Sequence, residues 1–188
     1  MESQNKIEIM AEITPNPNTL KFNVHKQLLP LGSCNFPNLE SAKDSVLAAR
    51  LFEIENVKGV MVGIDFVTVT KSADAEWPVM ARDIVESIRY FLQSNEPAVS
   101  KELEAALGGT AGGSEMERQI RTILDEEIRP AVARDGGDIV FYGYEDGVVK
   151  LHLQGACSSC PSSVITLKMG IENRLKQAFP EIKEVIQV

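Results

Sequence analysis

Two cysteines near the end of the chain have the type and spacing to do chemistry. Cys157 and Cys160 lie in the heptapeptide GACSSCP, residues 155–161, so that two residues separate the thiols. Residues 148–153 alternate and predict a strand before them, and residues 162–179 predict a helix after them. The first amides and the dipole of such a helix favour anionic sulfur, so both thiols should ionise more readily than free cysteine. Soft, paired thiolates suit two tasks, the binding of iron or zinc and the exchange of disulfides.

The residues alone leave three interpretations of this pair open. The cysteines could pack as small apolar residues, but the glycine and serines around them predict an exposed turn. They could exchange disulfides, although no tryptophan precedes the motif and no later strand offers an X-Pro loop, as thioredoxin-like proteins do. They could bind a metal centre, either zinc in an interaction module or iron in a cluster. We favour metal binding and keep the thiol–disulfide oxidoreductase and the zinc-linked module as alternatives.

Metal binding needs more thiolates than one chain supplies. A tetrahedral zinc site and a [4Fe–4S] cluster both take about four protein ligands. Cys34 stands alone in the other half of the chain, and we interpret it as a packed thiol. Two chains related by a two-fold axis would supply four thiolates, so we expect a site shared between two copies. His152 alternates with Leu151 and Leu153, which places it on the open side of the predicted sheet rather than among the ligands.

Composition limits the class of protein and of partner. The chain has 188 residues and a net charge of −8, which argues against nucleic acid because phosphate binding needs a basic surface. Three cysteines are too few for a disulfide scaffold and fit a reducing compartment. The polar N-terminus resembles neither a secretory signal nor a transit peptide, and no apolar run reaches the length of a membrane span. We therefore expect a cytoplasmic protein that does not associate with membranes.

Residues 1–107 predict an N-terminal α+β domain with the order β-β-α-β-β-α. The expected elements are strands at residues 6–14, 19–24, 57–62 and 66–70 and helices at residues 41–52 and 77–92. The sequence PNPN, residues 15–18, predicts the turn of a first hairpin, since proline and asparagine favour turn geometry. The glycine-containing turn at residues 63–65, between two β-branched runs, predicts a second hairpin. Residues 28–38 contain two prolines and a glycine and are expected to form a loop.

Residues 115–188 predict a second small α+β domain with the order α-β-β-α-β. Its expected elements are a helix at residues 115–134, strands at residues 139–144, 148–153 and 182–188, and the helix after the cysteines. Ser114 and Glu117 predict a capping box at the start of the first helix, Pro130 should kink or split this helix, and DGGD, residues 135–138, should end it. Asp146-Gly147 predicts the hairpin turn between the first two strands. The glycine-rich residues 108–114 predict a flexible linker, so we expect no single arrangement of the two domains.

Several motifs together resemble the C-terminal domain of NifU-like (Nfu) proteins. They are Arg129-Pro130, DGGD at residues 135–138, GACSSCPSS at residues 155–163 and TLKMGIE at residues 166–172. The N-terminal half, with TPNPNTLKF at residues 14–22, is similar to the Nfu N-terminal domain. The resemblance therefore covers nearly the whole chain apart from the linker.

The resemblance implies an iron–sulfur cluster carrier rather than an enzyme. Such a protein receives a [4Fe–4S] cluster from an upstream donor, holds it between two protomers and delivers it to apo-proteins. By position, Cys157 and Cys160 would be the cluster ligands of a cluster-bridged homodimer whose apo form could be a monomer. The resemblance assigns DGGD only a structural role in shaping the nearby turn, and it gives Cys34 and His152 no role.

Overall fold

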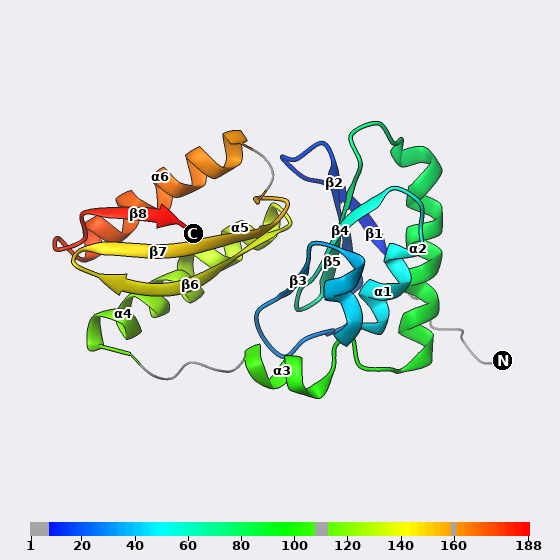
Figure 1. Cartoon of the computed structure of the whole chain (residues 1–188), viewed down its shortest axis with the longest axis horizontal. Coiled ribbons are helices and arrows are strands. Elements are labelled where there is room, and N and C mark those ends of the chain that lie inside the picture. Colours follow the sequence, from blue (N-terminus) through cyan, green and yellow to red (C-terminus); the bar gives the residue numbers. More distant parts are fainter. Residues whose placement is uncertain (1–7, 108–112, 159–160) are drawn as a thin grey trace.

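Two β-sheets, each with its own helices, make up the computed structural model of the chain (Figure 1). The structure describes residues 8–107, 113–158 and 161–188. Most of the predicted linker, residues 108–114, lies outside these ranges, and so does Cys160. Both halves mix strands with helices, so the α+β class predicted from the sequence is confirmed. Within the described ranges no helix has the length and apolar character needed to cross a bilayer.

The N-terminal sheet has antiparallel strands in the order β1-β2-β5-β4-β3. These strands are β1 (Met10–Ile13), β2 (Thr19–Asn23), β3 (Cys34–Phe36), β4 (Val57–Val62) and β5 (Phe66–Lys71). The helices are α1 (Val46–Phe52), α2 (Trp77–Ser94) and α3 (Lys101–Leu107), with a short 3₁₀ turn η1 (Leu39–Asp44) before α1. Both predicted hairpins form. The prediction of a loop at residues 28–38 is wrong for residues 34–36, which form β3. Cys34 pairs there with Val62 of the distant strand β4, and no local pattern encodes this contact.

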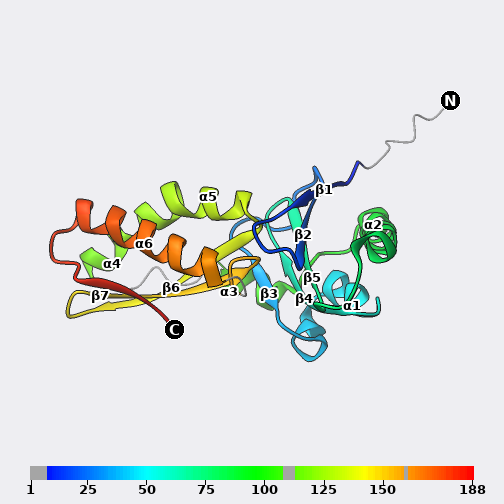
Figure 2. The ribbon, with the colours of Figure 1, turned by 90° about the horizontal axis from the view of Figure 1, so that it is seen from above.

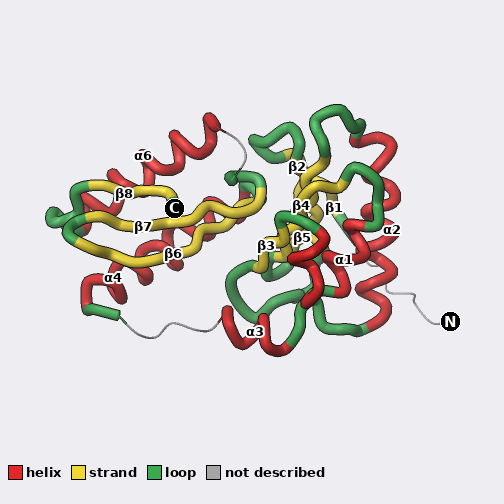
Figure 3. Tube along the Cα trace, in the orientation of Figure 1, coloured by secondary structure: helices red, strands yellow, loops and turns green. Residues whose placement is uncertain are grey.

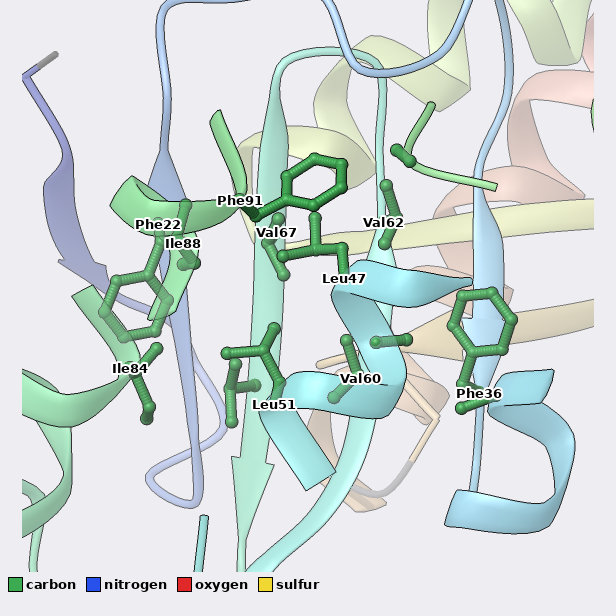
Figure 4. Close-up of a cluster of buried hydrophobic side chains, with 14 of the residues drawn as sticks. Phe22, Phe36, Leu47, Leu51, Val60, Val62, Val67, Ile84, Ile88 and Phe91 are labelled. Atoms are coloured by element: carbon green, nitrogen blue, oxygen red, sulfur yellow. The ribbon is translucent and has the colours of Figure 1, made fainter. Parts of the chain in front are cut away.

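Helices α1 and α2 cover one face of this sheet and form its hydrophobic core (Figure 4). Alternate strand residues such as Val60, Val62 and Val67 are buried together with Leu51 of α1 and Ile84 of α2. Burying one such aliphatic side chain contributes about 1.5–3 kcal/mol to folding. Because successive residues of a strand point to opposite faces, the residues between these valines lie on the face that α1 and α2 leave uncovered.

The C-terminal sheet has the order β6-β7-β8. Its elements are α4 (Glu115–Ile123), the π-helical turn η2 (Leu124–Ile128), α5 (Arg129–Arg134), β6 (Gly137–Glu145), β7 (Val148–Gly155), α6 (Pro161–Ala178) and β8 (Glu184–Gln187). β7 pairs antiparallel with β6 and parallel with β8, so α6 is a crossover between parallel neighbours, in the predicted order. Ser114 and Glu117 form the predicted capping box at the start of α4.

Two local signals in this domain act as predicted. Pro130 has no backbone N–H to donate, and the helical run loosens into a π turn just before it and restarts at α5. Asp146 and Gly147 take φ values of 50° and 89°, which suit the two-residue turn between β6 and β7. The order of elements in this half is therefore confirmed.

The two domains pack against each other. Helices α4, α5 and α6 lie on one face of the C-terminal sheet, and the N-terminal strands stand between α1 and α2 on one side and the C-terminal domain on the other (Figure 2). One end of the β6–β7 hairpin is directed at the N-terminal sheet (Figure 3), where β7 contacts β4 and β5. The sequence predicts no single arrangement, because a glycine-rich linker is flexible. Linker composition, however, determines only the freedom of the linker, while the fit of two faces determines whether the domains pack.

Candidate functional site

The turn between β7 and α6 positions the predicted cysteine site. β7 ends at Gly155, whose φ of +65° is a left-handed conformation that glycine adopts without strain. The N–H of Ala156 donates to Gly136 O at 3.0 Å, which joins this turn to the end of α5. Ser158 Oγ donates to Gly155 O at 2.8 Å. Hydrogen bonds on both sides therefore fix the backbone of this turn.

Cys157 points into the C-terminal domain rather than into solvent. Its side chain is 4% exposed and belongs to the core that includes Ile139 and Leu153. Gly137 provides the room for the sulfur, because a Cβ atom at that position would lie 2.5 Å from Cys157 Sγ. The prediction that a glycine- and serine-rich turn keeps the cysteines exposed is therefore wrong for Cys157. Cys160 lies outside the described residues, so the pairing of the two thiols stays a prediction.

An open, mostly apolar pocket of about 550 Å³ lies beside Cys157, which forms part of its wall. Helices α5 and α6 contribute Ala131 and Leu167, and the N-terminal domain contributes Pro15. Among the described residues that line the pocket, Asp135 is the one with a charged side chain. Such a lining limits the access of solvent to anything that the thiol binds.

An ion pair between the half-buried Arg129 and the buried Asp138 holds the DGGD stretch beside this turn. Asp138 is 5% exposed, its Oδ1 lies 3.0 Å from Arg129 Nε, and its Oδ2 accepts a hydrogen bond of 2.5 Å from Ser33 Oγ of the N-terminal domain. Arg129 also donates through Nη2 to Ile139 O at 2.9 Å. Gly136 has a φ of +75° and takes the left-handed position after α5, as predicted. The stretch thus has a structural role in shaping the neighbouring turn.

His152 and Cys34 lie in different surroundings. His152 is half-buried on β7, where its Nδ1 lies 2.5 Å from Val188 O, and Tyr142 on the same side is 65% exposed. This agrees with the prediction that His152 faces the open side of the sheet. Cys34 is buried in the N-terminal core, and desolvation raises the pKa of its thiol to about 11, as expected for a packed thiol. In the part of the chain that the structure describes, no cluster of three or more potential metal-ligating side chains occurs.

Sequence reasoning missed the N-terminal residues that touch the cysteine turn. Asn16 Nδ2 donates to Ala156 O at 3.2 Å, and Ser33 contacts the DGGD stretch as described above. The signal in the sequence is the motif TPNPNTLKF, residues 14–22, which predicts only that Asn16 lies in a turn. A turn prediction gives the local conformation of a residue, and it does not give the distant atom that its side chain contacts.

Comparison with known proteins identifies both halves. Residues 120–186 match the family model of the NifU-like domain, and residues 9–95 match that of the scaffold protein Nfu/NifU N terminal. The human NFU1 iron-sulfur cluster scaffold homolog, mitochondrial, is 45% identical over 181 residues, which cover 96% of this chain and 71% of that protein. The Arabidopsis thaliana NifU-like protein 5, mitochondrial, is 43% identical over 192 residues, which cover 100% of this chain and 70% of that protein.

Other relatives differ in length. A Drosophila erecta homologue with the same name as the human protein is 44% identical over 182 residues, and the match covers 96% of this chain and 64% of that protein. A solution NMR structure of a NifU-like protein from Saccharomyces cerevisiae is 30% identical, has a TM-score of 0.48, and covers 54% of this chain and 91% of that chain.

These relatives also correct one expectation and establish another. The predicted cytoplasmic location is contradicted, because the human, fly and plant homologues are all named as mitochondrial. The cysteine count argues against an oxidising compartment, but it does not separate the cytoplasm from other reducing compartments. The motif resemblance, by contrast, is confirmed by both family models and by 45% identity across 96% of the chain. The chain belongs to the Nfu family of NifU-like proteins.

Proposed function

We propose that this chain is an iron–sulfur cluster carrier, which holds a [4Fe–4S] cluster between two copies and passes it to apo-proteins. Cys157 and Cys160 are the cluster ligands in this proposal. The observation that supports it most is the position of Cys157, in a hydrogen-bonded turn before α6 and in the wall of an open apolar pocket. A relative with 45% identity is named as an iron–sulfur cluster scaffold.

The number of thiols requires a second copy. A cubane cluster takes about four thiolate ligands, and the candidate turn supplies two cysteines from each chain. Cys34 does not complete the set within one chain in this proposal, because its thiol is enclosed in the N-terminal core. Two turns that meet around one cluster would provide the four sulfurs, and the cluster would then join the copies.

The chemistry of delivery is ligand exchange rather than turnover of a substrate. The cluster is the cargo, and thiolates of a recipient protein replace those of the carrier one after another. The chain contributes fixed backbone at Ala156 and Ser158, thiolates near the start of α6, and an apolar pocket that limits solvent access. With two ligands from each copy, separation of the copies exposes half of the cluster to the recipient.

Anaerobic reconstitution with iron and sulfide tests this proposal. We expect about four irons and four sulfides per two chains, together with a shift from monomer mass to dimer mass, because a cubane carries that number. Cys157→Ala and Cys160→Ala should each abolish cluster binding and the cluster-linked dimer. Cys34→Ala is the matched control, since it removes the third thiol of the chain and should leave the iron content unchanged.

The same measurement separates the alternatives. A colourless dimer whose mass follows its zinc content would support a zinc-linked module instead. A reversible Cys157–Cys160 disulfide that turns over a dithiol substrate, without iron-dependent visible absorbance, would support a thiol oxidoreductase. A complete cluster on a single protomer, or on either cysteine variant, would contradict the proposal.

A further inference from the structure

The N-terminal sheet has a second face that α1 and α2 do not cover, yet its residues are buried. Lys21, Thr68 and Met61 form a row across strands β2, β5 and β4, since Lys21 pairs with Thr68 and Thr68 pairs with Met61. Their exposed fractions are 9%, 1% and 1%. Phe66 is likewise 5% exposed, and the ammonium of Lys21 lies 4.7 Å from the centre of its ring. Lysine and threonine at alternate positions are typical of a solvent-facing strand side, so another part of the molecule must cover them.

The part of the molecule that covers this row is the end of the C-terminal domain that carries the cysteine turn, and we call it the cover. A Cβ atom at Gly136 would lie 3.0 Å from Thr68 Cγ2, and a Cβ atom at Gly155 would lie 2.8 Å from Met61 Sδ. The backbone of both glycines therefore lies directly on the row formed by Lys21, Thr68 and Met61. These two glycines are hydrogen-bond partners of the turn that carries Cys157, as Ala156 N donates to Gly136 O.

Polar contacts reinforce this packing at its two sides. Asn16, in the β1–β2 turn, is 4% exposed and donates through Nδ2 to Ala156 O, one residue before Cys157. Its Oδ1 accepts a hydrogen bond from Asn18 N at 3.0 Å, which sets the direction of the amide. On the other side Ser33 donates to Asp138. Pro15, next to Asn16, lines the pocket beside Cys157.

We propose that the second face of the N-terminal sheet is a recognition surface for the cysteine turn of its own chain, and that a second copy can share a cluster with this turn only after the two domains separate. The first part stands on the contacts between the domains. The second part rests on the proposed function, because a partner turn that reaches Cys157 through its open pocket would meet Pro15 and, next to it, Asn16. The cover is held by a few polar contacts and two glycines, and such interfaces between domains of one chain commonly open and close.

Alkylation of Cys157 reports the separation without iron, because Pro15 of the N-terminal domain forms part of the wall of the open pocket that Cys157 lines. In a full-length background with Cys34→Ala and Cys160→Ser, Cys157 is the single thiol, so the rate of iodoacetamide labelling at fixed pH reports its accessibility. Asn16→Asp keeps the acceptor for Asn18 N but replaces the donor to Ala156 O by an anionic oxygen. We expect labelling about threefold to tenfold faster, the effect of losing one such hydrogen bond. Thr68→Arg places a long side chain where the backbone of Gly136 now packs, and it should accelerate the labelling of Cys157 further.

Asn18→Asp is the matched control. It makes the same chemical change in the same turn, but its side-chain oxygen accepts from Lys71 Nζ at 3.1 Å within the N-terminal domain. Its labelling rate should stay within about twofold of the background rate, as for most surface substitutions. Equal rates for the background, Asn16→Asp and Thr68→Arg would overturn the proposal, provided that Trp77 fluorescence shows each variant folded. Equal acceleration by Asn18→Asp would overturn it as well.

The cluster-dependent part has its own readout. With all cysteines restored, Asn16→Asp should form the cluster-linked dimer faster than the natural chain, and Asn18→Asp should not. If no chain forms a cluster, the proposed function fails while the labelling result still tests the contact between the domains. If the cluster forms equally fast on the natural chain, Asn16→Asp and Asn18→Asp, the N-terminal domain does not compete with the second copy for the cysteine turn. This part of the proposal is then overturned.

Discussion

Cys34 and Cys157 are almost equally buried, at 5% and 4% exposure, but what buries them differs. Cys34 lies in β3, paired with Val62, inside a core closed by its own domain. Cys157 lies in a turn, beneath Gly137, in the wall of an open pocket and next to a residue that the other domain contacts. An exposed fraction therefore does not by itself distinguish a packed structural thiol from a thiol that we propose as a cluster ligand. What matters is whether the covering atoms can leave while the domain stays folded.

Cys34 and Cys157 should differ most at alkaline pH, where ionisation of the Cys34 thiol should lower the stability of the N-terminal domain. Burial raises the pKa of its thiol from 9.0 to about 11, so the folded state holds the proton more tightly than the unfolded chain does. The stabilising effect is complete below pH 9 and is lost as the pH rises toward 11. The loss approaches about 1.4 kcal/mol per pH unit in this window.

Urea unfolding measures this effect, with fluorescence of Trp77, the one tryptophan of the chain, as the signal. Cys34→Ala should be less stable than the natural chain at pH 8, and the difference should shrink by about 2 kcal/mol by pH 10.5. Other groups titrate in both proteins and cancel in the comparison. Parallel stability curves from pH 8 to 10.5 would show that Cys34 is not a neutral thiol enclosed in the N-terminal core.

Gly137→Ala should produce the next largest effect, and it acts on Cys157. The added Cβ would lie 2.5 Å from Cys157 Sγ and 3.1 Å from Gln154 O, so the thiol or the strand must move. Overpacking of this kind costs about 1–3 kcal/mol, and we expect a lower cluster yield because the sulfur is displaced. Iron content after reconstitution and urea unfolding followed by circular dichroism give the two measurements.

The comparison variant is Gly170→Ala on α6, which also lines the pocket beside Cys157 but does not crowd its sulfur. Apart from the neighbouring backbone of α6 itself, no atom lies within 4 Å of a Cβ placed there, and alanine within a helix is favoured over glycine by about 0.5–1 kcal/mol. This variant should be as stable as the natural chain or slightly more stable, with an unchanged iron content. A normal cluster yield for Gly137→Ala would mean that the position of Cys157 in the covered turn is not the one from which it binds.

Much of the fold follows from local patterns. The PNPN turn, the Asp146-Gly147 turn and the cap at Ser114 each depend on residues within a few positions of one another, and all three form as predicted. Strand β3 has three residues and exists because β4 offers it an edge, so no local pattern encodes it. A short strand of this kind depends on a long-range partner, which a single sequence does not reveal.

The candidate site was predictable in its residue types but not in its surroundings. The spacing of Cys157 and Cys160 indicated paired thiolates, whereas the burial of Cys157 depends on Gly137, which is distant in the sequence and adjacent in space. The cover by Asn16 could not be predicted either. A polar row such as Lys21 and Thr68 has the pattern of a solvent-facing strand side, and only the packed domains show what lies on it.

The smallest effect that we predict lies at acid pH and in the C-terminal domain, opposite to that of Cys34. Hydrogen bonds from Lys176 Nζ and from Val185 N lower the pKa of Glu172, whose carboxylate thereby joins α6 to β8. A lowered pKa means that the stabilising effect is present above the ordinary value of 4.5 and is lost as the pH falls through the folded-state value.

Glu172→Gln keeps an acceptor for Val185 N but removes the charge, so it should lower the stability of the domain by about 0.5 kcal/mol at pH 7 and by almost nothing at pH 3. Hydrogen exchange of the Val185 amide, which belongs to this domain alone, gives the measurement. If the substitution costs as much at pH 3 as at pH 7, the hydrogen bond to Val185 rather than the charge of Glu172 holds α6 against β8. The expected contrast between an acid-sensitive C-terminal domain and an alkali-sensitive N-terminal domain would then be lost.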